Sequence, residues 1–296
     1  MQIVVRQTSG LGNQLFQYAA GRYLAKKYAG SLRIAHELPK NLTIHGASRP
    51  VLLRKFAISA PIGQANAFDR FVLSTRPLLA TPARIARAAC KIQVIREDPS
   101  PLLLHPDLEV DVGSRAVYLL GYWQVYSMVR DVEGELRVEF SPVEPLGRRS
   151  MQVAEQIRAA RNPVSIHLRR GDYLTVFGAK AILPMAYYER AMQYLLDTVG
   201  ACTFFVFSDD ASYAEQWAQT KRQLIVVDHN DAATAHEDLQ LMALCRHHII
   251  ANSTFSWWGA WLNPRTDKQV IAPSNWLGFD TSKTTLAVPE WKLIEA

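Results

Sequence analysis

The segment SIHLRRGDYL (165–174) joins the end of an apolar run to a group of polar side chains. Residues 164–168 have the length and composition of a buried strand. The polar side chains at its end are His167, Arg169, Arg170 and Asp172. Such groups are costly to bury unpaired. The segment therefore predicts a strand that presents these side chains to a ligand or to an internal ion network.

Strands and helices alternate through the rest of the second half. Further short apolar strands are expected at 203–210, 223–228, 248–252 and 268–273. Helices are expected between them at 184–198, 212–221 and 234–247. This alternation predicts βαβ units and a parallel sheet covered on both faces.

The first half is less regular. It opens with the strand-like MQIVVRQ, a glycine turn and a helix expected at 13–28, and another strand is expected at 115–124. Residues 37–112 contain many prolines and loop-like pieces. We predict an α/β protein of two domains, 1–145 and 146–296, of which the N-terminal one is more irregular.

Composition narrows the function classes. The chain has 296 residues, of which 49% are apolar and 20% charged, so it is globular with ample core. Its net charge of +6 suits nucleic acid, an anionic membrane or a phosphorylated ligand. It has no basic block or nucleic-acid motif, so we expect no nucleic-acid partner. Three scattered cysteines, the lack of a secretory leader and the lack of a long apolar stretch predict a cytoplasmic protein.

Ligands of open α/β sheets bind beyond the carboxyl ends of the strands. The first strand is followed by SGLGNQ, where Gly10 and Gly12 allow close approach of a ligand beside Asn13. Leu15 stands where a dinucleotide fingerprint needs glycine, and no phosphate-loop lysine follows. A simple strand-to-helix turn explains this loop equally well.

Strand geometry divides the opening segment. His167 and Arg169 are two residues apart and should share a face, whereas Arg170 should point the other way. Arg169 can offer a two-pronged guanidinium to a phosphate. Arg170 can brace the loop by pairing with Asp172 or with another acid. A structural Arg–Asp network without a ligand is the alternative.

Two further strand ends carry polar residues. Ser208, Asp209 and Asp210 suit a metal site, acceptors for a guanine edge, or helix capping by Ser208 or Asp209. No further acid or His nearby completes a cation site. Asn252, Ser253 and Thr254 open a helix whose N-terminus suits an anion. Together these strand ends fit a phosphate-bearing nucleotide. The tryptophans of that helix, Trp257, Trp258 and Trp261, are better explained by packing at a domain interface than by a sugar platform.

Five motifs extend this interpretation. They resemble, in the same order, motifs of the inverting α-1,2-fucosyltransferases, which include bacterial surface-polysaccharide and blood-group H enzymes. The five motifs are GLGNQLFQYAAGRYLA, GYWQ, SIHLRRGDY, FFVFSDD and DLQLMALCRHHIIANSTFSWWGAWLN. The resemblance implies a GT-B fold, with two Rossmann-like domains facing across a cleft. It also implies transfer of L-fucose from GDP-fucose to O2 of a terminal galactose, with inversion and without a metal or other cofactor. The N-terminal domain would bind the acceptor and the C-terminal domain the donor.

The resemblance also implies residue roles. Arg169 would grip the β-phosphate and stabilise the leaving group. Asp172 is the nearest candidate for a catalytic base, although bracing of Arg170 explains it equally. The expected donor-binding residues are Gly12, Asn13, His167, Arg169, Asp209, Asp210, Ser253, Thr254, Phe255 and Ser256.

Other functions remain as alternatives. The nearest is a GDP-fucose transferase of another linkage, such as α-1,6. An oxidoreductase or epimerase would need a complete glycine fingerprint and a Tyr-x-x-x-Lys pattern, and neither is present. A carbohydrate-binding protein without activity would not need His167 together with Arg169.

RIARAACKIQVIR (84–96) predicts one basic amphipathic helix with Ile85, Ala88, Ala89, Ile92 and Ile95 on one face. We favour a helix packed on the N-terminal domain. The alternative is a contact with an anionic membrane that carries lipid-linked acceptors.

Overall fold

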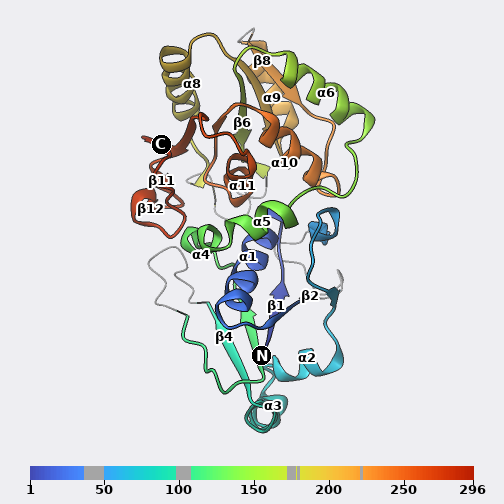
Figure 1. The fold of residues 1–296 in the computed structure, drawn as a ribbon. Coiled ribbons are helices and arrows are strands. Elements are labelled where there is room, and N and C mark those ends of the chain that lie inside the picture. Colours follow the sequence, from blue (N-terminus) through green and yellow to red (C-terminus); the bar gives the residue numbers. More distant parts are fainter. Residues whose placement is uncertain (37–49, 98–107, 172–177, 179–180, 221–222) are drawn as a thin grey trace. The chain divides into compact units, whose positions relative to one another are not determined.

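The computed structural model of the chain describes residues 1–36, 50–97, 108–171, 178, 181–220 and 223–296. The chain forms two compact units, Met1–Val143 and Glu144–Ala296 (Figure 1). Each unit contains a parallel sheet with helices on its faces.

The N-terminal unit contains a five-stranded parallel sheet in the order β3-β2-β1-β5-β4. Its strands are β1 (Gln2–Gln7), β2 (Ser31–His36), β3 (Ile62–Gln64), β4 (Ile92–Arg96) and β5 (Ala116–Leu120). From β1 the chain first adds strands on one side and later on the other. The order therefore reverses between β1 and β5, which is a topological switch point.

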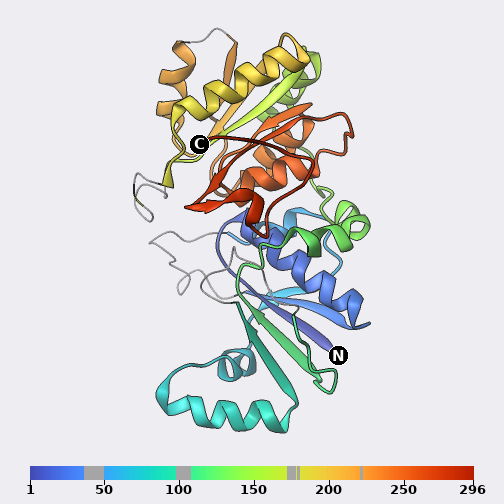
Figure 2. The same ribbon diagram turned by 90° about the vertical axis from the view of Figure 1, so that its left-hand side faces the viewer.

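Helix α1 (Leu11–Lys27) covers one face of this sheet. A Cβ on Gly21 would lie 2.5 Å from Val5 Cγ2, so the glycine lets α1 approach β1 closely. The other face packs against α2 (Ala67–Val72), and α3 (Pro77–Ala89) lies at the periphery of the unit (Figure 2). The unit is completed by η2 (Leu52–Lys55), α4 (Tyr126–Asp131) and α5 (Glu133–Glu139).

The single helix predicted for 84–96 is wrong. Helix α3 ends at Ala89, Lys91 has a φ of +53°, and β4 begins at Ile92. Strand β4 pairs with β5 along its whole length. The β-branched side chains of Ile92, Val94 and Ile95 suit this pairing, and it overrides the helical spacing of the apolar residues.

The C-terminal unit contains a six-stranded parallel sheet in the order β13-β10-β9-β6-β7-β8. Its strands are β6 (Pro163–Leu168), β7 (Thr203–Ser208), β8 (Leu224–Val227), β9 (His247–Ile249), β10 (Val270–Pro273) and β13 (Lys292–Ile294). The strands predicted for the second half are confirmed, with ends that differ by up to three residues. The order reverses between β6 and β9, so the switch point of this sheet lies directly beside the opening segment of the sequence.

Helices cover both faces of the C-terminal sheet (Figure 1). On one face, α8 (Met185–Val199) and α9 (Ala211–Gln219) pack on β6 through Tyr187 and its neighbours. On the other, α6 (Arg148–Ala159) and α10 (Ala235–Leu244) pack on Phe205 and Phe207. Helix α11 (Thr254–Leu262) follows β9. A small hairpin of β11 (Asn275–Trp276) and β12 (Phe279–Asp280) precedes η4 (Thr281–Lys283).

The three tryptophans of α11 are core residues. Trp257 and Trp258 are fully buried, and their rings lie 5.0 Å apart in an edge-on arrangement. Trp257 also contacts Trp291 and donates its indole N–H to the Leu286 carbonyl. Packing in the core of the C-terminal unit is therefore a role of this cluster.

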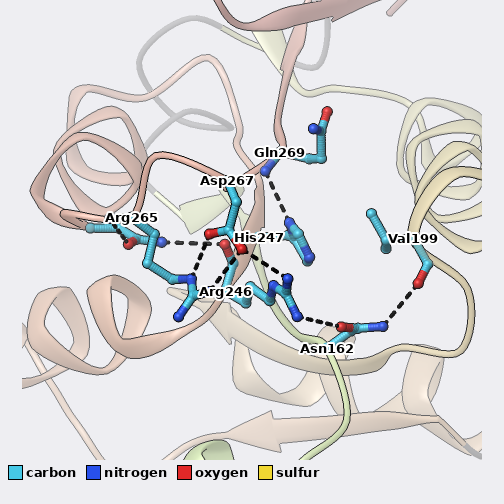
Figure 3. A network of polar contacts seen from close by, with 8 residues as sticks. Asn162, Val199, Arg246, His247, Arg265, Asp267 and Gln269 are labelled. Carbon is cyan, nitrogen blue, oxygen red and sulfur yellow. Dashed lines mark hydrogen bonds and ion pairs between the residues drawn. The ribbon is translucent and has the colours of Figure 1, made fainter.

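A polar network ties together the starts of the C-terminal strands (Figure 3). Arg246 and Arg265 both pair with Asp267 at 2.8 Å. Arg246 also donates to Asn162, and the Gln269 backbone N–H donates to His247 Nδ1. These contacts join the residues that precede neighbouring strands, so we assign a structural role to this edge of the sheet.

Candidate active site

The opposite edge of the C-terminal sheet collects the polar residues that follow its strands. Arg169 and Arg170 follow β6, Asp209 and Asp210 follow β7, and Ser253 follows β9. Because β6 lies between β7 and β9, all three groups meet around the end of one strand. This is the switch point at which ligands of such sheets bind.

Asp209 holds the Arg169 side chain and the loop after β6 at the same time. Its Oδ2 lies 2.9 Å from Arg169 Nη1, and its Oδ1 accepts a hydrogen bond of 2.9 Å from the Arg170 backbone N–H. A Cβ on Gly171 would lie only 2.7 Å from the same Oδ2. Glycine at 171 therefore leaves room for the carboxylate that orients Arg169.

Arg170 has different partners from Arg169. Its Nε lies 3.3 Å from Asp210 Oδ2, and its guanidinium lies over the Tyr213 ring at 3.6 Å from the centroid. Asp210 is therefore the acid against which Arg170 braces the loop. The other candidate partner, Asp172, lies outside the described residues.

The two neighbouring acids have different tasks. Asp210 caps α9, because its Oδ1 accepts from the Tyr213 backbone N–H at 3.1 Å. The prediction that Ser208 or Asp209 caps this helix is wrong. Ser208 instead bridges the loop, with its hydroxyl bonded to the Leu168 carbonyl and to the Asp210 N–H. Desolvation raises the pKa of Asp210, but the hydrogen bonds that it accepts lower this pKa overall.

His167 is a neutral, buried member of the group. Burial and, to a smaller extent, the positive charge of Arg169 lower its pKa to about 3, although Asp209 opposes the shift. Its Nδ1 is buried and has no hydrogen-bond partner among the described residues. Its ring lies 5.5 Å from that of Phe255, which connects the end of β6 to α11. So low a pKa makes His167 a poor proton acceptor near neutral pH.

Helix α11 adds a positive end to the same place. Ser253 is its N-cap, and its Oγ accepts from the Phe255 N–H at 3.4 Å. The first backbone N–H groups of a helix have no partner within the helix, and its dipole favours an anion there. Thr254 opens the helix and is half-buried. Ser256 is buried, and its hydroxyl bonds to the backbone of Ala251 and Ser253, so it holds the turn together.

Gly12 and Asn13 belong to the N-terminal unit and form a separate group there. Gly12 is buried in the first turn of α1. The Asn13 amide donates to Ser9 Oγ at 3.0 Å and accepts from Gln124 Nε2 at 3.1 Å. Ser9 has a φ of +68°, a left-handed conformation that non-glycine residues seldom adopt. These residues join the ends of β1 and β5 at the switch point of their own sheet.

The polar group around Asp238 was not predicted from the sequence. Asp238 has its pKa raised to about 7 by desolvation, with Glu237 adding to the shift and a hydrogen bond from Asn230 opposing it. The Asn230 amide lies 2.6 Å from Asp238 Oδ1, and His229 Nε2 lies 2.8 Å from Ser150 Oγ. His229 and Asn230 directly follow the predicted strand at 223–228, so they could have been found among the residues that follow each strand.

In the described part of the chain, no cluster of three or more His, Cys, Asp or Glu side chains is arranged to hold a metal ion. Within the same residues, no helix is long and apolar enough to cross a membrane.

Comparisons with known proteins agree with this architecture. The model of Glycosyl transferase family 11 matches residues 107–295. An α-1,2-colitosyltransferase of Escherichia coli is 31% identical over 99% of both chains. The O-antigen biosynthesis glycosyltransferase WbnK of Escherichia coli is 41% identical over 44% of both chains.

Two further comparisons are more distant. The galactoside α-(1,2)-fucosyltransferase 1 of Saimiri sciureus is 25% identical over 70% of this chain and 61% of its own. Among solved structures, the fucosyltransferase NodZ from Bradyrhizobium aligns with a TM-score of 0.52 at 12% identity, over 87% of this chain and 91% of that one. This last likeness concerns the fold, which is that of GT-B glycosyltransferases. The chain belongs to glycosyl transferase family 11.

Proposed function

We propose that this glycosyltransferase moves L-fucose from GDP-fucose to O2 of a terminal galactose and forms an α-1,2 linkage with inversion. The observation that carries the proposal is the meeting of Arg169, fixed by Asp209, with the N-terminus of α11 at the β6/β9 switch point. A guanidinium fork and a helix N-terminus together suit a diphosphate. The names of the relatives favour an α-1,2 over an α-1,6 linkage.

The geometry indicates how the reaction would be assisted. As the bond between fucose and phosphate breaks, negative charge gathers on GDP. Arg169 and the first turn of α11 are preorganised to stabilise this charge without moving. His167, being neutral, can offer a hydrogen bond to the nucleotide without adding charge. Asp209 would position Arg169 rather than contact the sugar.

The acceptor hydroxyl would attack from the face opposite to GDP, which inverts the anomeric centre. Asp172 stays our candidate for the base. Asp209 and Asp210 are poorly suited to that task, because each is engaged with an arginine and with backbone N–H groups. We propose that neither a metal nor another cofactor is needed, because fixed cationic groups of the chain would neutralise the diphosphate.

The diphosphate site also suits a second sugar donor. The full-length relative from Escherichia coli is named as a colitosyltransferase. Colitose is L-fucose without its 3-hydroxyl group. Both sugars would present the same GDP to Arg169, so the diphosphate site cannot discriminate between them. GDP-colitose is therefore our second candidate donor.

We further propose that the acceptor is a galactose-terminated oligosaccharide, carried on a lipid and bound by the N-terminal unit. The relative named for O-antigen biosynthesis supports a surface glycan. The reaction would then take place in the cytoplasm, at the inner face of the membrane.

The test is an assay of purified protein with GDP-fucose or GDP-colitose and a panel of β-galactosides, with linkage determined by NMR. We expect an α-1,2 product with at least one donor, and activity that survives excess chelator. A product linked to another position of galactose would overturn the assigned linkage. Turnover that stops on chelation and returns with added metal would overturn the metal-free mechanism.

A further inference from the structure

Helix α3 presents its large apolar side chains to solvent. Only Ala83 is buried among its thirteen residues. Leu78 is 92% exposed and Ile85 62%. Residues seven apart lie on one side of a helix, so Leu78 and Ile85 share the face opposite to Ala83. The helix therefore turns its small side, which includes Ala83, inward and its large apolar side outward.

The chain around this helix carries only positive charge. Between Asp69 and Glu97 there are six cationic residues and no acid. They are Arg70, Arg76, Arg84, Arg87, Lys91 and Arg96. This segment accounts for a charge equal to the net +6 of the whole protein. Arg76 precedes the helix, Arg84 lies within it and Lys91 follows it, and all three are exposed.

A cavity of about 470 Å³ lies between α3 and β4, and its lining includes Ser74, Thr75, Arg87 and Arg96. Desolvation lowers the pKa of Arg96, and the positive charges of Arg6 and Arg87 lower it further. No carboxylate among the described residues forms an ion pair with Arg87 or Arg96. The backbone holds both guanidinium groups, because Arg87 donates to the Val72 carbonyl at 2.7 Å and Arg96 to the Leu73 carbonyl at 3.5 Å. The outward cations of this segment are therefore the exposed ones.

We propose that the α3 surface, which comprises Leu78, Ile85 and the exposed cations Arg76, Arg84 and Lys91, docks on an anionic lipid bilayer. Leu78 and Ile85 enter the boundary between headgroups and acyl chains, and the exposed cations face lipid phosphates. Because the α3 surface combines apolar side chains with cations, it suits an anionic bilayer better than it suits a purely polar partner.

The charge also argues against a second copy of the chain on this face. A symmetric dimer would place the same patch against itself, and so would bring two acid-free cationic segments together. A bilayer with anionic lipids offers the opposite charge. The docking surface is independent of the proposed reaction, and it would hold the protein at the membrane that carries a lipid-linked acceptor.

The test is co-sedimentation of the full chain with vesicles of phosphatidylcholine alone and of phosphatidylcholine with 30% phosphatidylglycerol, a composition chosen to be about one-third anionic. Wild type should bind the anionic vesicles more tightly, and added salt should weaken that binding. The double variant L78S/I85S should bind them at least tenfold more weakly, because each side chain that enters the bilayer contributes about tenfold in affinity. R76E/R84E should also lose most of the binding.

The matched control is V138S/M151S, which removes two other exposed apolar side chains and should bind as wild type does. Unchanged turnover of a soluble galactoside would show that the variants are folded. If the wild type does not turn over a galactoside, circular dichroism shows instead whether the variants are folded. Wild type that ignores anionic vesicles, or L78S/I85S that binds as well as wild type, would overturn the proposal. The proposal would also be overturned if the wild type binds no vesicles but forms a dimer in sedimentation velocity, and if L78S/I85S abolishes that dimer.

Discussion

Removal of the Arg169 guanidinium should affect catalysis far more than folding. The guanidinium forms an ion pair with Asp209 at 2.9 Å, and the two side chains are 19% and 25% exposed. A pair that is mostly buried contributes more than a surface pair, about 1–3 kcal/mol. Asp209 keeps its hydrogen bond to the Arg170 backbone when Arg169 is truncated, which limits the loss. We therefore expect Arg169→Ala to unfold within about 10 °C of wild type.

The catalytic cost follows from the bonds that the fork would make. Two charge-assisted hydrogen bonds to a diphosphate are each worth about 1.5–3 kcal/mol, so their loss costs about 3–6 kcal/mol. At about 1.4 kcal/mol for each factor of ten, kcat/KM should fall about 10²- to 10⁴-fold in Arg169→Ala. Arg169→Lys keeps the charge but loses the fork, and we expect a loss of about 10- to 100-fold.

The assay measures kcat/KM for transfer to a β-galactoside beside GDP affinity by calorimetry and thermal unfolding. Arg170→Ala is the matched control, because it removes a neighbouring guanidinium that contacts Asp210 and Tyr213 instead. Its kcat/KM should fall much less than that of Arg169→Ala. If Arg169→Ala keeps kcat/KM and GDP affinity within about threefold of wild type, Arg169 does not hold the phosphate and the reasoning fails.

Four further variants or conditions test the neighbouring residues. Gly171→Ala should lower kcat/KM about tenfold or more with little change in Tm, because its Cβ would lie 2.7 Å from the Asp209 carboxylate that orients Arg169; an unchanged kcat/KM would contradict this. Ser253→Ala should raise KM for GDP-fucose and cost about 1 kcal/mol of stability, since it removes the α11 cap. The pH profile of kcat/KM should show no change near pH 6.5 that is caused by His167, because the pKa of this residue is about 3. A change near pH 6.5 that is kept in Arg170→Ala and lost in His167→Gln would show that His167 is not neutral in the folded protein. Asp238→Asn should stabilise the fold at pH 8 by up to about 4 kcal/mol and by much less near pH 4, as measured by urea unfolding. The sign follows because a pKa raised to about 7 makes ionisation of the folded wild type unfavourable as pH rises from about 4 to 7; the magnitude is an upper bound, because Asp238 is partly exposed.

The second half of the sequence could be interpreted because its strands are buried on both faces. A parallel strand such as β7 is a continuous apolar run that ends sharply in acids, and this signal is local. The first half gave weaker signals. Strand β4 has no fully buried residue, so its pattern does not separate a strand from a helix. Only its pairing with β5, a contact between distant residues, decides the question.

The candidate site shows the same limit on a smaller scale. Alternation along β6 predicts that Arg169 and Arg170 diverge, because it is a property of one strand. The division of tasks between Asp209 and Asp210 depends on the turn between β7 and α9, where no such rule applies. The raised pKa of Asp238 is caused by burial, and an acid in the first turn of a helix gives no sign of burial in the sequence.

Residue type alone does not identify the site, because both edges of the C-terminal sheet carry arginine, aspartate and histidine. At the strand starts, two arginines converge on Asp267, and Arg246 also donates to Asn162, which precedes the neighbouring strand β6. At the strand ends, Arg169 and Arg170 are matched by Asp209 and Asp210, and the N-terminus of α11 adds positive potential that no described side chain offsets. Topology places that surplus at the switch point. An anion is therefore expected at the strand ends, and the strand starts are left to hold the sheet together.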